Sequence, residues 1–333
     1  RSARLLLDVG PFGYPPAPGH GHADCLSLLL EVDGRPLLVD AGTGSYADPK
    51  WRAYWRGTAA HNTVTVAGVD QTLLRGLFAS GRPARPRVEA LVTDELLRLV
   101  VASHDGYQRL RPPVRHRRLL LELPGLNYLV LDLLVGQGRQ QVSQYWHFPP
   151  TAELRETPPV WSCRLEQADL LSLRFAASHA GTLAVIAGQP DPPQGWVAGP
   201  DGRPYPAPVL VWQAAAPLPA AIATLLQVQP QPQATLELQE LPQGLALQLA
   251  APVWTALVLV RLTPRAPLVW PPWETDAAVL VHWQRSEQTA LLLAHGREVR
   301  HHGELLINLA AATPGLVLTS PPIRSCQARS TNL

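Results

Sequence analysis

The chain has 333 residues, a formal net charge of +2, and 35 prolines against 24 glycines. So many prolines exclude an all-helical fold, because a proline inside a helix removes a hydrogen bond and clashes with the preceding turn. The basic residues are scattered, which argues against nucleic acid as a partner, and no apolar run reaches the roughly 18 to 20 residues of a membrane span. With no methionine in the sequence, Arg1 is not a translation start, and we expect a longer protein.

Short apolar or alternating runs, broken by Gly, Pro, Asp and Asn, fill most of the sequence and predict antiparallel β-strands. The runs at residues 26–32 and 36–41 flank Asp33-Gly34-Arg35, which predicts a hairpin because glycine accepts a positive φ. Further strands are expected at residues 62–68, 96–103, 117–123 and 128–135. The predicted fold class is therefore all-β, built on a large antiparallel β-sandwich.

One segment between these strands has a helical pattern. Asp48 and Pro49 precede KWRAYWR, and an aspartate cap followed by proline in the first turn predicts a short helix over about residues 49–57. Helical spacing places Tyr54 on one face with two tryptophans and places Arg52 and Arg56 together on another.

The composition changes at QVQPQPQ, residues 227–233, which is typical of a linker. Beyond it, apolar runs predict a smaller β unit. We therefore divide the chain into a β-sandwich at 1–226, a linker at 227–234, a small C-terminal β domain at 235–320 and a loose tail at 321–333.

The densest group of polar residues lies between positions 19 and 62. If residues 19–24 are extended, His20, His22 and Asp24 point the same way, and Asp40 and His61 follow within about forty residues. Imidazole nitrogen and carboxylate oxygen both suit zinc, so a three-ligand zinc site is one interpretation of this group. The alternatives are solvated loop histidines and a turn carboxylate that caps the following backbone.

The string at residues 19–71, which includes GHGHAD (19–24), PLLVDAGTG (36–44) and WRAYWRGTAAHNTV (51–64), resembles the heparinase II/III-like domain of bacterial polysaccharide lyases. The likeness continues more weakly through HDGYQRL (104–110), HRRLLL (116–121) and YWHF (145–148). It implies an antiparallel β-sandwich that, in the family, follows an N-terminal (α/α) toroid, which is absent from this chain.

The resemblance also implies site residues. It places zinc ligands at His22, Asp40 and His61, an active-site histidine at His20, and a supporting residue behind the ligands at Asn62. One zinc ion is expected, in a structural role that aims His20 into the cleft.

The implied reaction is β-elimination on a uronic acid, which needs groups that neutralise the carboxylate and move a proton. Tyr46 and Tyr54 are the tyrosines expected to face the cleft, and the alternative for each is packing or stacking. Arg52 and Arg56 are candidates for binding sugar carboxylates, because a guanidinium fork matches a carboxylate; the alternative is a solvated helix face.

We therefore expect part of a polysaccharide lyase that acts on an acidic polysaccharide together with the toroid, in the periplasm or outside the cell. Alone, the chain is expected to be inactive or weakly active. The main alternative is a non-catalytic carbohydrate-binding or structural module of the same fold. A zinc hydrolase that uses a metal-bound hydroxide is disfavoured, because no general-base Glu or Asp is placed next to the histidines as in HExxH.

Overall fold

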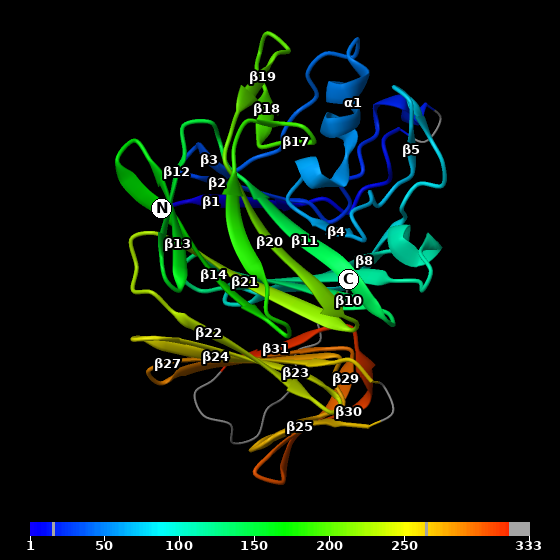
Figure 1. Cartoon of the computed structure of the whole chain (residues 1–333). Helices are drawn as coiled ribbons and strands as arrows, with labels where there is room; N and C mark the ends of the chain where they lie inside the picture. The colour runs from blue at the N-terminus through cyan, green and yellow to red at the C-terminus, as the bar shows by residue number, and fades with distance from the viewer. Residues whose placement is uncertain (15–16, 264–265, 320–333) are drawn as a thin grey trace.

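The computed structural model describes residues 1–14, 17–263 and 266–319 of the chain. That part is a stack of antiparallel β-sheets with one short α-helix, which confirms the all-β prediction. Figure 1 shows the layers in order, from the loops and helix of the first residues at the top to the C-terminal strands at the bottom. The predicted tail at 321–333 lies outside the described residues. No described helix has the length and hydrophobicity to span a membrane.

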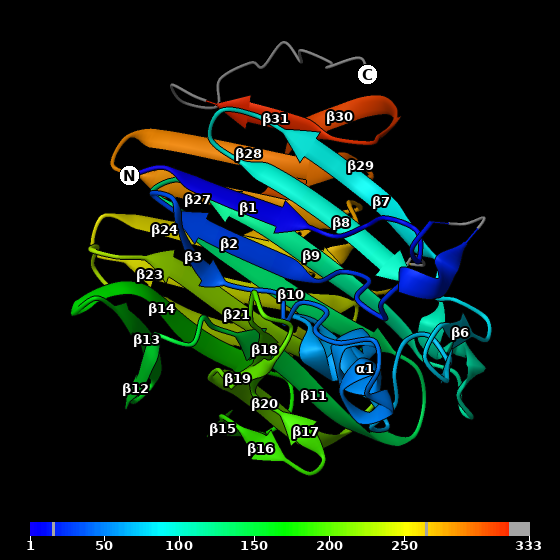
Figure 2. The same ribbon diagram turned by 90° about the horizontal axis from the view of Figure 1, so that it is seen from above.

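Two sheets form the layer beneath the loops. The three-stranded sheet contains β1 (Ala3–Leu7), β2 (Leu28–Val32) and β3 (Arg35–Leu38). The four-stranded sheet has the order β15 (Thr182–Ile186), β20 (Val209–Pro217), β11 (Arg139–His147), β4 (Val64–Val66). Seen from above in Figure 2, β1 to β3 lie over the strands of the next layer.

The central layer is a single eight-stranded sheet. Its order is β12 (Glu153–Thr157), β13 (Val160–Leu165), β14 (Ala168–Ala177), β21 (Ala220–Val228), β10 (Asn127–Val135), β9 (Arg115–Leu123), β8 (Arg98–His104), β7 (Pro86–Thr93).

Two further sheets complete the stack. The six-stranded sheet has the order β22 (Thr235–Leu241), β23 (Gly244–Ala251), β24 (Trp254–Arg261), β27 (Val279–Arg285), β28 (Gln288–Ala294), β31 (Leu316–Thr319). The four-stranded outer sheet has the order β25 (Leu268–Trp270), β26 (Trp273–Thr275), β29 (Gly296–His301), β30 (Glu304–Thr313).

Short elements lie in the connections. They are the helix α1 (Pro49–Arg56), the 3-10 turns η1 (Pro18–His20), η2 (Thr58–Ala60) and η3 (Gly106–Arg109), and the paired short strands β5 (Leu74–Arg75) with β6 (Ala79–Ser80), β16 (Gln189–Pro190) with β17 (Pro193–Gln194), and β18 (Trp196–Ala198) with β19 (Pro204–Pro206).

The hairpin between β2 and β3 follows the sequence closely. Val32 pairs with Arg35, so the turn consists of Asp33 and Gly34, whose φ angles are both positive at 50° and 77°. This is the type I′ geometry that suits the twist of two antiparallel strands. Arg35 therefore belongs to the strand.

Strand β10 lies in the central layer and contacts the sheets on both of its sides. Its residues 127–134 are all buried, because the strand is covered on both faces. Leu129, Leu131 and Leu133 pack toward the six-stranded sheet, whereas Tyr128 and Val130 pack toward the sheets beneath the loops. A continuous apolar run is thus typical of a strand in a central layer, which is covered on both faces.

The two predicted β units share one hydrophobic core. The largest buried cluster combines side chains of β8, β9, β10 and β21 with side chains of β22, β23, β24, β27 and β28. The linker residues are also held in place: Gln227 donates to Asn127 at 2.8 Å, and Ala234 is fully buried. The boundaries at 226 and 235 stay a prediction, but the two units are in extensive apolar contact.

Candidate active site and metal centre

Helix α1 organises the loops above the sheets. Asp48 accepts hydrogen bonds from the backbone N–H groups of Lys50 and Trp51 at 2.8 and 3.2 Å, and Pro49 occupies the first turn, as the sequence predicts. The helix ends before Gly57, and the chain then passes through η2 to His61.

Among the described residues, His22, Asp24 and His61 form a compact group of side chains able to bind a metal ion. One donor atom from each lies within 4.8 Å of the other two. Burial, followed by the charge of His61, lowers the pKa of His22 to about 3, so its imidazole is neutral and offers a lone pair. Burial also raises the pKa of the Asp24 carboxyl to about 6.

Asp40 contacts the same group from behind His61. Its Oδ2 lies 2.7 Å from Nδ1 of His61, and its Oδ1 accepts the backbone N–H of Gly42 at 2.7 Å. Burial opposes both charges, but their attraction outweighs it, lowering the pKa of Asp40 to about 2 and raising that of His61 to about 9.

The other ring nitrogen of His61 is available to a metal ion. Nε2 is buried and has no hydrogen-bond partner among the described residues, so a proton there has no acceptor. A carboxylate on one imidazole nitrogen and a metal on the other is a common arrangement at zinc sites. The donor set of His22, Asp24 and His61 therefore fits a zinc ion, whereas Asp40, predicted as a ligand, holds Nδ1 of His61 from behind.

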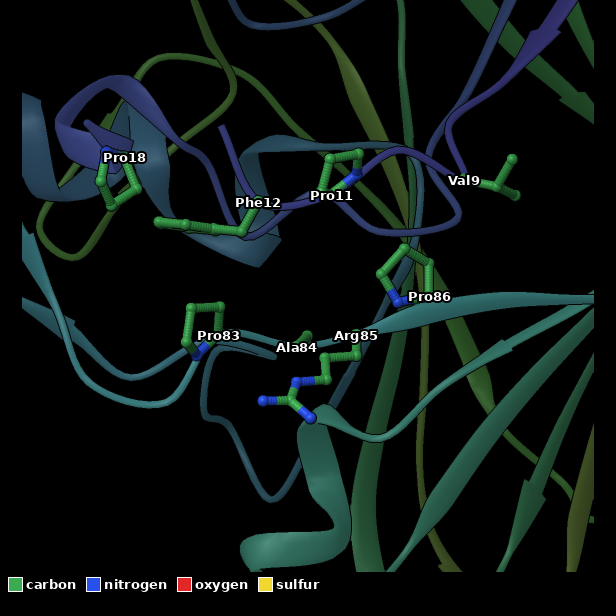
Figure 3. Close-up of a pocket in the computed structure, with 8 residues that line it drawn as sticks. All are labelled: Val9, Pro11, Phe12, Pro18, Pro83, Ala84, Arg85 and Pro86. Carbon is green, nitrogen blue, oxygen red and sulfur yellow. The ribbon is translucent and has the colours of Figure 1, made fainter. Parts of the chain in front are cut away.

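A cavity of about 360 Å³ reaches this centre and is lined by three carboxylates, those of Asp8, Asp24 and Asp40. A second cavity of about 420 Å³, shown in Figure 3, lies between Phe12 and Pro18 on one side and the segment 83–86 on the other. That cavity is largely apolar and contains none of the proposed ligands. Of these two cavities, the first borders the candidate metal centre.

His20 and Tyr46 lie together at the surface. Nδ1 of His20 is 3.1 Å from the hydroxyl of Tyr46, and the two rings meet edge to face with centroids 5.4 Å apart. Both side chains are exposed. The structure therefore pairs the predicted active-site histidine with one of the two predicted tyrosines.

Tyr54 has a different position. It is 7% exposed, and its hydroxyl donates to the carbonyl of Trp196 at 3.1 Å and accepts the N–H of the same residue at 3.2 Å. Burial raises its pKa to about 12. Its contacts are those of packing, the alternative that the sequence left open, because the helix turns this face toward β18.

Arg52 and Arg56 are buried, so the structure supports neither a carboxylate-binding surface nor a solvated helix face. Arg52 donates to Thr43 Oγ1 and to the carbonyls of Gly19 and Leu77 at 2.9 to 3.1 Å. Arg56 donates to the carbonyls of Gly21, Gly76, Leu77 and Ala79. Both arginines fasten loops to the helix.

Asn62 links the ligand-bearing segments. Its amide donates to the carbonyls of Leu28 and Val39 at 2.7 and 2.9 Å, and its Oδ1 accepts the backbone N–H of His147 at 2.6 Å. The side chain is fully buried. These contacts fix the backbone directly after His61.

A buried ion pair beneath the site was not predicted from the sequence. Nε and Nη2 of Arg118 each donate to Asp132 at 2.8 Å, and Nη1 donates to the carbonyls of Leu26 and Asn62 at 2.6 and 2.7 Å. Arg118 and Asp132 are directly paired on β9 and β10 and are fully buried. The pair anchors the two segments that carry Asp24 and His61 to the central sheet.

Two histidines extend this network in a fixed hydrogen-bond order. His116 Nε2 lies 2.6 Å from Asp132 Oδ1, His104 Nε2 lies 3.0 Å from His116 Nδ1, and the N–H of Gly106 donates to His104 Nδ1 at 3.1 Å. Every contact is satisfied only when both imidazoles are neutral and protonated at Nε2.

We expect the free energy of unfolding to fall as the pH falls below about 6.5. Burial lowers the pKa of His116, and lowers that of His104 well below its ordinary value, whereas both bind protons near pH 6.5 when unfolded. The full stability is therefore present above that pH, and each histidine removes up to about 1.4 kcal/mol per pH unit below it.

Urea denaturation between about pH 8 and pH 5 measures this slope, and His104→Gln should reduce it. Nitrogen-15 spectra should show both rings as neutral Nε2–H tautomers at about pH 6. A charged ring in those spectra would contradict the proposed hydrogen-bond order.

The fold and the site define the class of protein: a layered antiparallel β-sandwich with a group of histidines and carboxylates at one end. Residues 1–216 match the family described as "Heparinase II/III-like, C-terminal". The chain belongs to this family, as the resemblance of residues 19–71 implied. A comparison with curated proteins found no match.

Several solved structures share the fold. Heparan sulfate lyase HepC from Pedobacter heparinus is 17% identical with a TM-score of 0.59, covering 78% of this chain and 39% of its own. A structure described as heparinase III is 13% identical with a TM-score of 0.63, covering 78% and 40%, and another is 15% identical with a TM-score of 0.60, covering 75% and 37%. The chain thus spans about two fifths of the length of these lyases.

Proposed function

We propose that the chain is the β-sandwich part of a polysaccharide lyase that cleaves uronic-acid-containing polysaccharide by β-elimination. The observation that carries the proposal is the exposed pair of His20 and Tyr46, joined at 3.1 Å beside a centre suited to zinc. Membership of the heparinase II/III-like family supports the same reaction class.

The reaction needs a proton-moving group at the surface. The C5–H bond of the uronate breaks, its electron pair forms the C4–C5 double bond, and the C4–O bond breaks with a proton ending on the departing oxygen. Tyr46 is suited to take the proton from C5 or to supply the proton to the departing oxygen, because its hydroxyl is accessible and lies within hydrogen-bond distance of His20. His20 orients the hydroxyl and is near enough to exchange a proton with it.

We propose one zinc ion with a structural role, held by His22 and His61 together with Asp40 or Asp24. When bound, zinc supplies a cross-link between the loop at 19–24 and the segment before β4. His20 is two residues from His22, so fixing His22 also fixes the backbone that presents His20. The toroid is proposed to provide the other wall of the cleft, in a periplasmic or secreted protein.

The test is the protein expressed with its complete reading frame and incubated with heparan sulfate, alginate and polygalacturonate. We expect new ultraviolet absorbance from unsaturated uronyl ends on at least one polymer, and a loss of about 100-fold or more in kcat for His20→Ala. His179→Ala, at the turn between β14 and β15, is the matched control and should leave kcat unchanged.

Two outcomes would count against the proposal. Binding of these polymers without any unsaturated ends would favour the non-catalytic carbohydrate-binding module. Normal activity of His20→Ala would remove His20 from the reaction.

A further inference from the structure

The hairpin of β5 and β6 carries an exposed phenylalanine next to the candidate active site. Phe78 is 48% exposed. Its ring stacks on Tyr46 with centroids 5.9 Å apart and an interplanar angle of 18°, and it meets His20 edge to face at 6.3 Å. An aromatic surface therefore continues directly from the pair of His20 and Tyr46.

The hairpin is held rigidly against helix α1. Arg56 donates to the carbonyls of Gly76, Leu77 and Ala79, and Arg52 also donates to Leu77. These bonds fix the backbone on both sides of Phe78. On its other side Phe78 packs against Gly19, where an added Cβ would lie 3.5 Å from that of Phe78. The position of the ring is thus set by the fold.

Positive charge lies directly behind the aromatic surface. The guanidinium carbon of Arg52 is 4.6 Å from the ring centroid of Tyr46 and 5.7 Å from that of Phe78. Among the described residues, neither Arg52 nor Arg56 forms a salt bridge with an acidic side chain. Arg52, a buried cation without a salt-bridge partner among the described residues, attracts an anionic ligand to the rings in front of it.

We propose that Phe78 is a substrate-binding residue, on which one sugar ring of an anionic polysaccharide stacks beside His20 and Tyr46. The inference rests on the proposed lyase function and adds a contact that sets affinity for the chain. The apolar face of a pyranose covers an aromatic ring, while the charge of Arg52 favours a uronate over a neutral sugar. Arg52 and Arg56 act as positioning residues, through the hairpin backbone.

Kinetics of the complete protein test this contact. Phe78→Ala is expected to raise KM about tenfold and to change kcat less than twofold, because stacking binds substrate and transition state alike. Phe78→Tyr should restore KM. Leu305→Ala, which removes an apolar side chain of similar exposure (44%) from the outer sheet, is the matched control and should change neither constant.

A binding experiment separates this inference from the lyase proposal. A hexamer of galacturonate added to the present chain should shift the ring protons of Phe78 and Tyr46, and neutral maltohexaose should not. Such shifts without unsaturated ends from the complete protein would support the binding site and refute the lyase. If Phe78→Ala leaves both turnover and KM unchanged, the stacking contact is refuted. It is also refuted if the variant has a lower melting temperature but an unchanged KM, because Phe78 would then be packed against another part of the complete protein and would not bind substrate.

Discussion

Replacing His61 with alanine is expected to abolish zinc binding, whereas the wild-type chain should bind about one equivalent. Nε2 of His61 is buried without a hydrogen-bond partner among the described residues, and its Nδ1 is held by Asp40, so this imidazole is oriented before any metal arrives. His22→Ala should have the same effect, because its neutral ring supplies the second nitrogen. Metal analysis after dialysis measures the stoichiometry directly, and removal of zinc with a chelator should lower the melting temperature.

The carboxylates should contribute unequally. Asp40→Asn is expected to weaken zinc affinity more than Asp24→Asn, since Asp40 also fixes the orientation of His61, and loss of such a partner typically costs about 10- to 100-fold. His302→Ala, in the turn between β29 and β30, serves as the control and should retain the full equivalent of zinc. Wild-type protein without metal, or His61→Ala with a full equivalent, would contradict the proposed centre.

The second large effect is expected for Asp132→Asn, which should destabilise the fold by about 3 to 5 kcal/mol. The substitution leaves Arg118 buried without a counter-charge, and it replaces an oxygen that accepts hydrogen bonds by an amide donor facing other donors. Those donors include Gln144, whose Nε2 lies 2.7 Å from Asp132 Oδ2. Urea denaturation at neutral pH measures the change in the free energy of unfolding.

Glu31→Gln provides the comparison, because it makes the same chemical change in an exposed ion pair. Glu31 lies 4.0 Å from Arg4, whose side chain is 81% exposed, so solvent screens the pair and the expected change is below about 1 kcal/mol. Zinc affinity of Asp132→Asn should also fall, since Arg118 then loses the partner that aligns it with the carbonyls of Leu26 and Asn62. Equal stabilities for the two variants would refute the role of the buried pair.

Local features of the fold were predictable because they depend on neighbouring residues. Asp33 and Gly34 form the expected hairpin turn, and Asp48 caps the expected helix. The stacking of the C-terminal sheet on the central sheet was not predicted, because periodicity shows which residues are buried but not which sheet covers them. The uninterrupted apolar run of β10 was the available signal, since a strand that faces solvent on one side alternates.

Some residues of the candidate site could likewise be predicted from the sequence and others could not. The sequence predicts ligands at His22, Asp40 and His61 because they lie in one local motif. In the structure His22 and His61 lie together with Asp24, and Asp40 contacts His61. Arg52 and Arg56 were expected at the surface, since helical spacing does not reveal that the hairpin at 74–80 covers that face of α1. The pair of Arg118 and Asp132 escaped notice because its partners are adjacent only after β9 and β10 pair, although a lone aspartate in an apolar strand was the clue.

The core shared across residues 227–234 has a consequence for how this protein can be divided. The segment has the composition of a linker, yet a chain ending there would expose a broad apolar face of the eight-stranded sheet, including Leu129, Leu131 and Leu133. Exposed apolar faces of that kind promote association between molecules. The C-terminal sheets therefore cover one apolar face of the β-sandwich, and we expect a chain cut between the two to associate through that face instead of behaving as a transferable module.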